Sequence, residues 1–226
     1  MKKAIVLLSG GLDSATCLYW AKSKKYKTFA LIFDYGQRHR RELESALKLC
    51  RVSKTPHEVV RFALPWGGSS FIGRGGEGAK LPNRRSPSAM AGNGIPSTYV
   101  PARNTIFLSF ALSYADVVNA DAVVIGANAI DYSGYPDCRP DYLKAMGRVA
   151  RLGTRRGDSG KTIDILSPLV HRTKAQIIRM GAELNVPYRW TWSCYKGGRK
   201  PCGECDSCIL RAKGFEDARR IDPILN

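Results

Sequence analysis

The sequence predicts a doubly wound α/β fold with a mainly parallel sheet. Short apolar runs of strand length alternate along the chain with longer segments in which apolar residues recur at helical spacing. This alternation is typical of a parallel sheet that helices cover on both faces. The chain has 226 residues, of which 44% are hydrophobic and 24% charged, so it is long enough and apolar enough to bury a core.

Five strands and five helices follow from this pattern. Strands are expected where apolar residues run together, at residues 4–8, 28–33, 57–61, 122–125 and 162–166. Helices are expected between them, at residues 14–24, 39–50, 104–118, 140–152 and 173–184. Ligands bind beyond the carboxyl ends of such strands, which directs attention to the loops 9–14, 34–39, 127–139 and 168–173.

Two regions depart from the alternation. Residues 64–97 are rich in Gly, Pro, Ser and Arg and show neither period, so we expect a flap or a dimer contact there. Residues 191–226 are rich in cysteine. We therefore expect an α/β domain at residues 1–190 and a small metal-binding segment at residues 191–226 packed on it.

The first expected strand runs directly into Ser9-Gly10-Gly11-Leu12-Asp13-Ser14 and then into a helix. Glycines allow backbone N–H groups to approach an anion, and the helix N-terminus adds unpaired donors and partial positive charge. Asp13 is expected either to cap the helix or to help hold a Mg²⁺ ion on a phosphate. A tight turn without a ligand is the alternative.

The ordered string of this loop resembles the pyrophosphate loop of the ATP pyrophosphatases, the PP-loop superfamily with an adenine nucleotide alpha hydrolase-like fold. The resemblance implies that ATP adenylates an oxygen and that the loop binds the departing pyrophosphate. The residues expected to bind ATP are then Leu8, Ser9, Gly10, Gly11, Leu12, Asp13, Ser14, Ala15, Thr16, Cys17 and Leu18. Lys174 matches a lysine that commonly serves this fold, although it is otherwise an ordinary residue of a first helical turn. The chain lacks the Gly-x-x-x-x-Gly-Lys-Ser/Thr pattern of an ordinary P-loop, which disfavours kinase or GTPase chemistry.

Four cysteines near the C-terminus have the number and softness that tetrahedral zinc requires: Cys194, Cys202, Cys205 and Cys208. With four protein ligands the Zn²⁺ ion would be structural. We expect Asp206 or Ser207 to cap a short helix that ends at Gly214, and Lys196, Arg199, Lys200 and Arg211 to offset the thiolate charge. A redox pair at Cys202 and Cys205, or an iron–sulfur cluster, is the alternative.

Four further segments resemble the QueC family of 7-cyano-7-deazaguanine synthases: residues 33–39, 97–104, 131–140 and 191–195. The resemblance implies a C–N bond-forming ligase that uses ATP twice to convert 7-carboxy-7-deazaguanine and ammonium to 7-cyano-7-deazaguanine (preQ0) in queuosine- or archaeosine-type 7-deazapurine biosynthesis. An adenylated acid and then an amide would be intermediates. The family also suggests a homodimer. The chain has more basic residues than we expect for this family, and residues 73–93 look like a divergent insertion.

The resemblance also suggests roles for individual residues. The catalytic residues would be Asp13, Lys174 and Arg103. A flat base with a carboxylate would be bound by Tyr99, Arg103, Asp131, Tyr132, Tyr135, Asp137 and Arg139, where tyrosines pack, aspartates accept from the amino edge and an arginine pairs with the carboxylate. His39 is a candidate proton shuttle. Cys138 lies among these residues, but adenylation already supplies the activation that a thioester would provide.

The formal net charge of +17 suits nucleic acid binding, yet the basic residues are scattered and lack interleaved aromatic side chains, so this function is not favoured. The N-terminal apolar run is too short for a signal peptide and no segment has the length of a membrane span, so we expect a cytoplasmic protein. Three alternatives remain: a tRNA-modifying enzyme of the same superfamily, a catalytically inactive zinc-stapled binding protein, and a relative that modifies a protein terminus.

Overall fold

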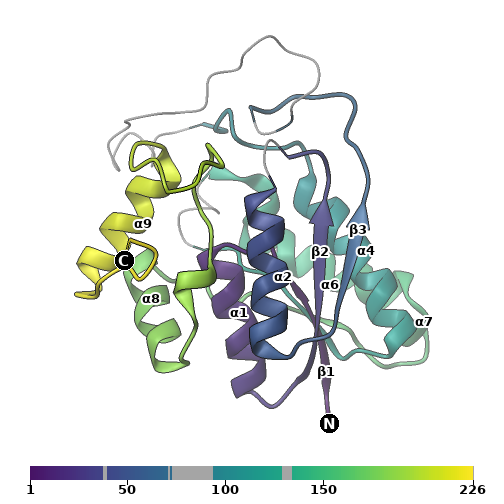
Figure 1. Ribbon diagram of the computed structural model, residues 1–226. Helices are drawn as coiled ribbons and strands as arrows, with labels where there is room; N and C mark the ends of the chain where they lie inside the picture. The colour runs from purple at the N-terminus through teal and green to yellow at the C-terminus, as the bar shows by residue number, and fades with distance from the viewer. Residues whose placement is uncertain (38–39, 71, 73–93, 129–133, 226) are drawn as a thin grey trace.

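The computed structural model describes residues 1–37, 40–70, 72, 94–128 and 134–225. Its sheet has five parallel strands in the order β3-β2-β1-β4-β5 (Figure 1). The strands are β1 (Lys3–Leu7), β2 (Lys27–Asp34), β3 (His57–Arg61), β4 (Ala122–Val124) and β5 (Asp164–Leu166). Each lies on an expected strand. β1, β2 and β4 are mostly buried, as apolar runs of this length are in a sheet covered on both faces, whereas β3 at the edge of the sheet is only partly buried.

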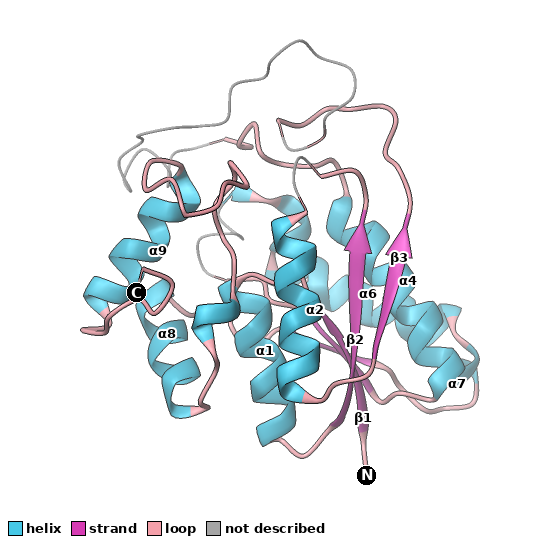
Figure 2. Cartoon of the chain, viewed as in Figure 1, coloured by secondary structure: helices cyan, strands magenta, loops and turns pink. Residues whose placement is uncertain are grey.

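The helices of the described ranges are α1 (Leu12–Ser23), α2 (Arg41–Ser53), α4 (Arg103–Val118), α6 (Pro140–Gly153), α7 (Arg155–Asp158), α8 (Lys174–Glu183) and α9 (Asp206–Asp217). Two short 3-10 helices, Pro136–Cys138 and Tyr188–Trp190, lie just before α6 and after α8 respectively. Figure 2 shows the helices on both sides of the strands. The five expected helices are confirmed within a few residues at their ends. The one-turn helix α7 was not expected, since only a Thr154 side-chain cap marks its start.

Alternate residues of the strands face two separate layers of core. Ala4 and Val6 pack with α1, α2 and α8, whereas Ile5 and Leu7 face α4 and α6. Figure 1 shows α1, α2 and α8 in front of the sheet and α4 and α6 behind it. The predicted doubly wound α/β class is therefore confirmed.

The chain reverses its direction of travel across the sheet after β3. From β1 it proceeds outward through β2 to β3, and α4 then returns it to β4 on the other side of β1. The connections that leave β1 and β4 therefore run to opposite faces of the sheet, toward α1 and α6 respectively, and sheets of this kind bind ligands in the crevice between two such connections.

The C-terminal segment packs on the α8 side of the molecule. Phe215 and Ala218 join the same core layer as α1 and α8. The expected end of the last helix was wrong: α9 passes through Gly214 and continues to Asp217. A Cβ on Gly214 would lie 2.4 Å from Cγ of Lys174, so glycine is required here for close packing of α9 on α8.

Two other expectations for α9 were also wrong. The residue before the helix is Cys205, and it makes no side-chain capping bond, so neither Asp206 nor Ser207 is the cap. Arg211 was expected to offset the charge of the thiolates. It is instead buried in an ion pair with Asp222, at 2.6 Å from Nε to Oδ2, and also donates to Oγ1 of Thr191 at 2.8 Å. Its charge therefore anchors the C-terminal tail and the segment before Cys194.

Of the described helices, none combines the length and apolar character that crossing a bilayer demands.

Candidate active site

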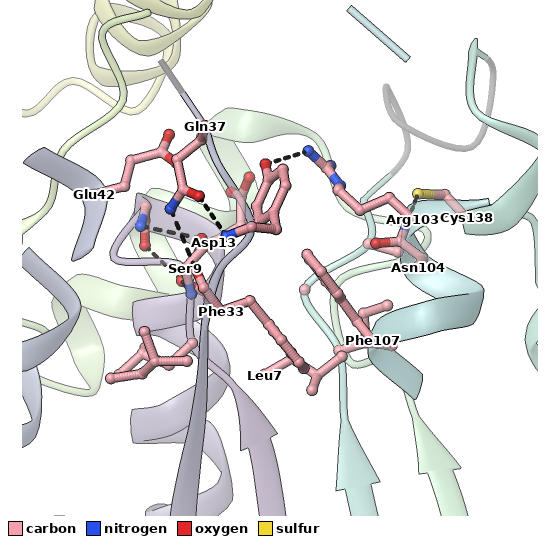
Figure 3. Close-up of a pocket in the computed structure, with 18 of the residues that line it drawn as sticks. Leu7, Ser9, Asp13, Phe33, Gln37, Glu42, Arg103, Asn104, Phe107 and Cys138 are labelled. Carbon is pink, nitrogen blue, oxygen red and sulfur yellow. Dashed lines mark hydrogen bonds between the residues drawn. The ribbon is translucent and has the colours of Figure 1, made fainter. Parts of the chain in front are cut away.

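A cavity of about 270 Å³ lies beyond the carboxyl ends of β1, β2 and β4, at the crevice where the strand order reverses (Figure 3). Its floor and walls come from the loop after β1, the loop after β2, the start of α4 and the segment around Cys138. Its polar lining residues include Ser9, Asp13, Ser14, Tyr35, Gln37, Glu42, Arg103, Asn104, Tyr135 and Tyr195.

The loop after β1 is held in shape by its own serines. The Ser14 hydroxyl accepts from the Ser9 backbone N–H at 3.2 Å and donates to the Gly11 carbonyl at 3.1 Å, and the two hydroxyls lie 3.1 Å apart. The N-cap residue of α1 is Gly11, which has no side chain with which to cap the helix. The first amides of α1 are therefore available to an anion in the cavity.

Two glycines make this loop possible. Gly10 has φ +88°, and a Cβ there would lie 2.2 Å from the carbonyl oxygen of Glu42. Gly126, just after β4, has its Cβ position 3.2 Å from the backbone nitrogen of Ser14. Any larger residue at Gly10 would push α2 away from the loop, and one at Gly126 would crowd the start of α1.

Asp13 points back toward α8 instead of capping α1. Its carboxylate accepts from Nζ of Lys174 at 2.7 Å and 2.9 Å and from Nδ2 of Asn128 at 3.1 Å. Of the two roles expected for Asp13, the helix cap was therefore wrong, because Gly11 holds that position, and the role beside Mg²⁺ stays a prediction. The ion pair places Lys174 of α8 beside the loop after β1, residues 9–14, which is called the phosphate loop below. Its expected role requires this position.

Arg103 begins α4 on the opposite side of the cavity from Glu42 (Figure 3). Its Nη1 donates to the Tyr35 hydroxyl at 3.1 Å, and its guanidinium lies 5.9 Å and 5.8 Å from the ring centres of Tyr35 and Phe107. Burial raises the pKa of the Tyr35 phenol, although Arg103 opposes this shift. Nε of Arg103 is buried and has no hydrogen-bond partner among the described residues. Arg103 is thus a fixed cation in a largely aromatic wall.

Glu42 is a residue of this cavity that the motifs did not identify. It lies in the first turn of α2, beside the phosphate loop. Burial raises the pKa of its carboxyl to about 7, and the positive charge of Arg103 opposes that rise. An acid in the first turn of a helix is common on any protein surface, so only its partial burial at the cavity and its raised pKa mark it out.

The four cysteines of the C-terminal segment converge as expected. Their Sγ atoms all lie within 4.8 Å of one another, although Cys194 is eight residues from Cys202. Backbone N–H groups of Glu204 and Cys205 both donate to Sγ of Cys202 at 3.4 Å. A hydrogen bond from Cys208 lowers the pKa of Cys205 to about 5. This cluster can hold a metal ion.

A second cavity, of about 160 Å³, separates the phosphate loop from the cysteine-rich segment. Gly11, Asp13, Glu42 and Tyr195 line both cavities. The other lining residues are Leu12, Lys174, Trp192, Ser193, Ser207, Leu210 and Arg211. The backbone N–H of Trp192 donates to the Gly10 carbonyl at 2.9 Å, so the C-terminal segment is bonded directly to the loop.

Comparison with known proteins assigns the chain to a family. A family model described as "Queuosine biosynthesis protein QueC" matches residues 3–219. The chain belongs to the QueC family. It is 55% identical to a protein of Trichodesmium erythraeum named 7-cyano-7-deazaguanine synthase, over 99% of this chain and 100% of that one. It is 52% identical to a protein of the same name from Thermoplasma acidophilum, over 99% of this chain and 91% of that one.

The solved structures are more distant and bear on the fold alone. NMN synthetase from Francisella tularensis superposes with a TM-score of 0.50 at 16% identity, covering 97% of this chain and 78% of that one. This agrees with the parallel five-stranded sheet that helices cover on both faces.

The residues that the QueC resemblance assigned to substrate are not all in the cavity. Tyr135 lines it, and Tyr99 stacks on Tyr135 with ring centres 6.0 Å apart. Asp137 is buried, and its Oδ2 accepts the Asn104 backbone N–H at 2.9 Å, which fixes the start of α4. Arg139 is exposed at the start of α6 and does not line the cavity. Asp131, Tyr132 and His39 lie outside the described residues.

Proposed function

We propose that this QueC-family chain converts 7-carboxy-7-deazaguanine and ammonium to 7-cyano-7-deazaguanine, with two molecules of ATP consumed. The observation that carries the proposal is the convergence, in one cavity, of the phosphate loop with Arg103 and Tyr135. The names of the curated relatives support the same reaction. A single pocket suffices, because both halves of the reaction activate an oxygen on the same carbon.

In the first half, a carboxylate oxygen of the base attacks the α-phosphorus of ATP and pyrophosphate leaves. The amides at the start of α1 and the hydroxyls of Ser9 and Ser14 are placed to hold the departing phosphates. Lys174 supplies positive charge beside them, and the reaction's Mg²⁺ would add more. Ammonia then attacks the acyl carbon and AMP leaves, which yields the amide.

In the second half, the amide oxygen attacks a second ATP and again releases pyrophosphate. The nitrogen then loses its two protons as AMP departs, so that a carbon–nitrogen triple bond forms. Arg103 lies across the cavity from the loop and is placed to pair with the carboxylate before activation. Tyr135, backed by Tyr99, offers a face for the flat base.

We propose that the metal of the four-cysteine cluster is structural Zn²⁺. Tetrahedral Zn²⁺ with Zn–S bonds of about 2.3 Å needs sulfurs about 3.8 Å apart, and the Cys202 and Cys208 sulfurs are 4.0 Å apart. With four thiolate ligands the ion would fold the segment and leave no position for substrate. Trp192, which bonds the phosphate loop, would thereby be held in place.

The proposal also includes an assembly of two copies. Phe110 and Val117 of α4 are 40% and 71% exposed, and Val149 and Leu152 of α6 are 51% and 75% exposed. These helices are neighbours, since the Tyr142 hydroxyl donates to the Thr105 hydroxyl at 2.8 Å. Exposed apolar side chains on two neighbouring helices fit a homodimer contact. The division at residue 190 into two units and the cytoplasmic location stay predictions.

A mass-spectrometric assay tests the reaction. Purified protein with 7-carboxy-7-deazaguanine, ammonium and Mg-ATP should yield the nitrile, with two AMP and two pyrophosphate for each nitrile. If the base stays unchanged while ATP and metal are bound, the proposal is wrong for this substrate. The net charge of +17 would then make tRNA the next substrate to test.

A further inference from the structure

We propose that the second cavity admits ammonium and that Glu42 takes one proton from it, so that ammonia reaches the activated carbon in the first cavity. This inference rests on the proposed function, because it assumes that ammonium is the nitrogen donor. An ammonium ion has no free electron pair and cannot attack an acyl carbon. A base near its path is therefore a chemical requirement of the reaction.

Glu42 is placed to be that base. It lines both cavities, so this residue lies between the second cavity and the proposed site of adenylation. Asp13 is the other carboxylate of the second cavity, and it is already paired with Lys174 at 2.7 Å. Among the described residues, no cation lies within ion-pair distance of Glu42.

The charges around Glu42 come from several elements. Arg103 of α4 attracts its carboxylate across the first cavity, and Tyr35 after β2 lies on the same wall. Asp13, Lys174 and Arg211 line the second cavity with it. Lys174 and Arg211 are each paired with an aspartate, at 2.7 Å and 2.6 Å respectively. Glu42 is therefore the carboxylate left to meet an incoming cation.

The proton transfer balances within these groups. An N–H bond of ammonium breaks, its electron pair remains on nitrogen, and the proton bonds to a carboxylate oxygen of Glu42. Ammonia forms the C–N bond and loses a proton to solvent, and the acyl C–O bond breaks with its electron pair on AMP. Glu42 releases its proton to solvent before the next ammonium arrives. A carboxyl whose pKa is about 7 accepts and releases a proton readily near neutral pH.

A comparison of two nucleophiles tests this role. Hydroxylamine is largely uncharged at neutral pH and needs no base before it attacks, giving a hydroxamic acid and AMP. For Glu42→Gln we expect kcat/KM for ammonium to fall by about 10²-fold or more, with hydroxylamine used almost as well as by the wild type. The matched control is Glu44→Gln on the same helix, an exposed residue paired with Arg41, which should change neither rate.

Three results would overturn the proposal. An unchanged rate with ammonium would show that Glu42 is not the base. An equal fall in rate with both nucleophiles would assign Glu42 to adenylation or pyrophosphate binding. So would the loss, in Glu42→Gln, of the exchange of pyrophosphate into ATP that requires 7-carboxy-7-deazaguanine. If the wild type shows no such exchange with 7-carboxy-7-deazaguanine, the proposed function itself fails, and this inference with it.

A second variant tests the route itself. Leu210 lines the second cavity but not the first, so Leu210→Trp should narrow it. We expect a several-fold higher KM for ammonium with the KM values for ATP and the acid unchanged. Ile209→Trp, at the neighbouring position that lines neither cavity, is the control. A KM for ammonium that does not change in Leu210→Trp would exclude the cavity as the entry route.

Discussion

Lys174 and Asp13 form an ion pair, at 2.7 Å from Nζ to Oδ2, between the first turns of α8 and α1. A cation in the first turn of a helix opposes the helix dipole and costs roughly 0.3–1 kcal/mol. The capping box of Thr173 and Gln176 stabilises α8 without help from Lys174. The lysine therefore contributes to the phosphate loop and not to its own helix.

The first prediction concerns this pair. Lys174→Met keeps the length of the side chain and removes its charge, so the rate of AMP formation should fall on the order of 10²- to 10³-fold. Stability should change by only about 1 kcal/mol, since both partners are partly exposed. Steady-state kinetics and thermal unfolding measure the two effects. Lys213→Met removes the exposed pair with Asp217 and should leave the rate unchanged.

The second prediction concerns the contact between α8 and α9. Gly214→Ala would place a Cβ 2.4 Å from Cγ of Lys174, so we expect a loss of about 1–3 kcal/mol in the free energy of unfolding and a lower rate. Gly147→Ala is the matched control, because that helical glycine has no atom within 4 Å of its Cβ position. It should stabilise by about 0.5–1 kcal/mol. Equal effects of the two changes would contradict the packing argument.

The third prediction concerns the metal. Cys205→Ser removes one of the four converging thiols, so metal analysis should find less than one Zn²⁺ per chain and the Tm should fall by more than about 5 °C. The activity should fall as well, because the Gly10–Trp192 bond joins this segment to the phosphate loop. Chelation of the metal from the wild type should lower the Tm and the activity in the same way, and added Zn²⁺ should restore both. Full stability without metal would refute a structural ion.

The fourth prediction concerns Cys138. Its sulfur lies 3.0 Å from Nδ2 of Asn104, and a serine oxygen can accept the same bond. Cys138→Ser should therefore lower activity by less than about tenfold if the cysteine is not a nucleophile. Rate and ATP affinity are measured together. Complete loss of turnover with ATP binding intact would restore the covalent mechanism.

The fifth prediction follows from the raised pKa of Glu42, which is about 7 in the folded protein against an ordinary 4.5. A carboxyl whose pKa is higher in the folded protein than in the unfolded chain lowers the free energy of unfolding as it ionises. This loss of stability is absent below pH 4.5, grows between the two pKa values and is complete above about pH 7. Glu42→Gln should therefore be more stable than the wild type at pH 8, by about 1–3 kcal/mol. Denaturant unfolding at pH 8 and pH 5 measures this, and the difference should shrink at the lower pH. A larger gain at pH 5 would have the wrong sign.

Much of the fold could be predicted because its signals are local. The apolar runs of β1 and β2 and the glycines after β1 lie close together in sequence, so their periodicity and order predict strand, loop and helix directly. The end of α9 was missed because glycine in a helix usually marks its last turn, whereas Gly214 is there for contact with Lys174.

The site divides in the same way. The sequence by itself determined the loop after β1 and the four-cysteine cluster, because the glycines and serines of the loop, and three of the four cysteines, lie close together in sequence. Only the tertiary structure decided that Lys174 meets Asp13, 161 residues away, and that Glu42 lies between two cavities. These contacts depend on how closely α2, α8 and α9 pack around the loop after β1. The packing of the helices is decided by contacts between segments that are far apart in sequence, which no local pattern encodes.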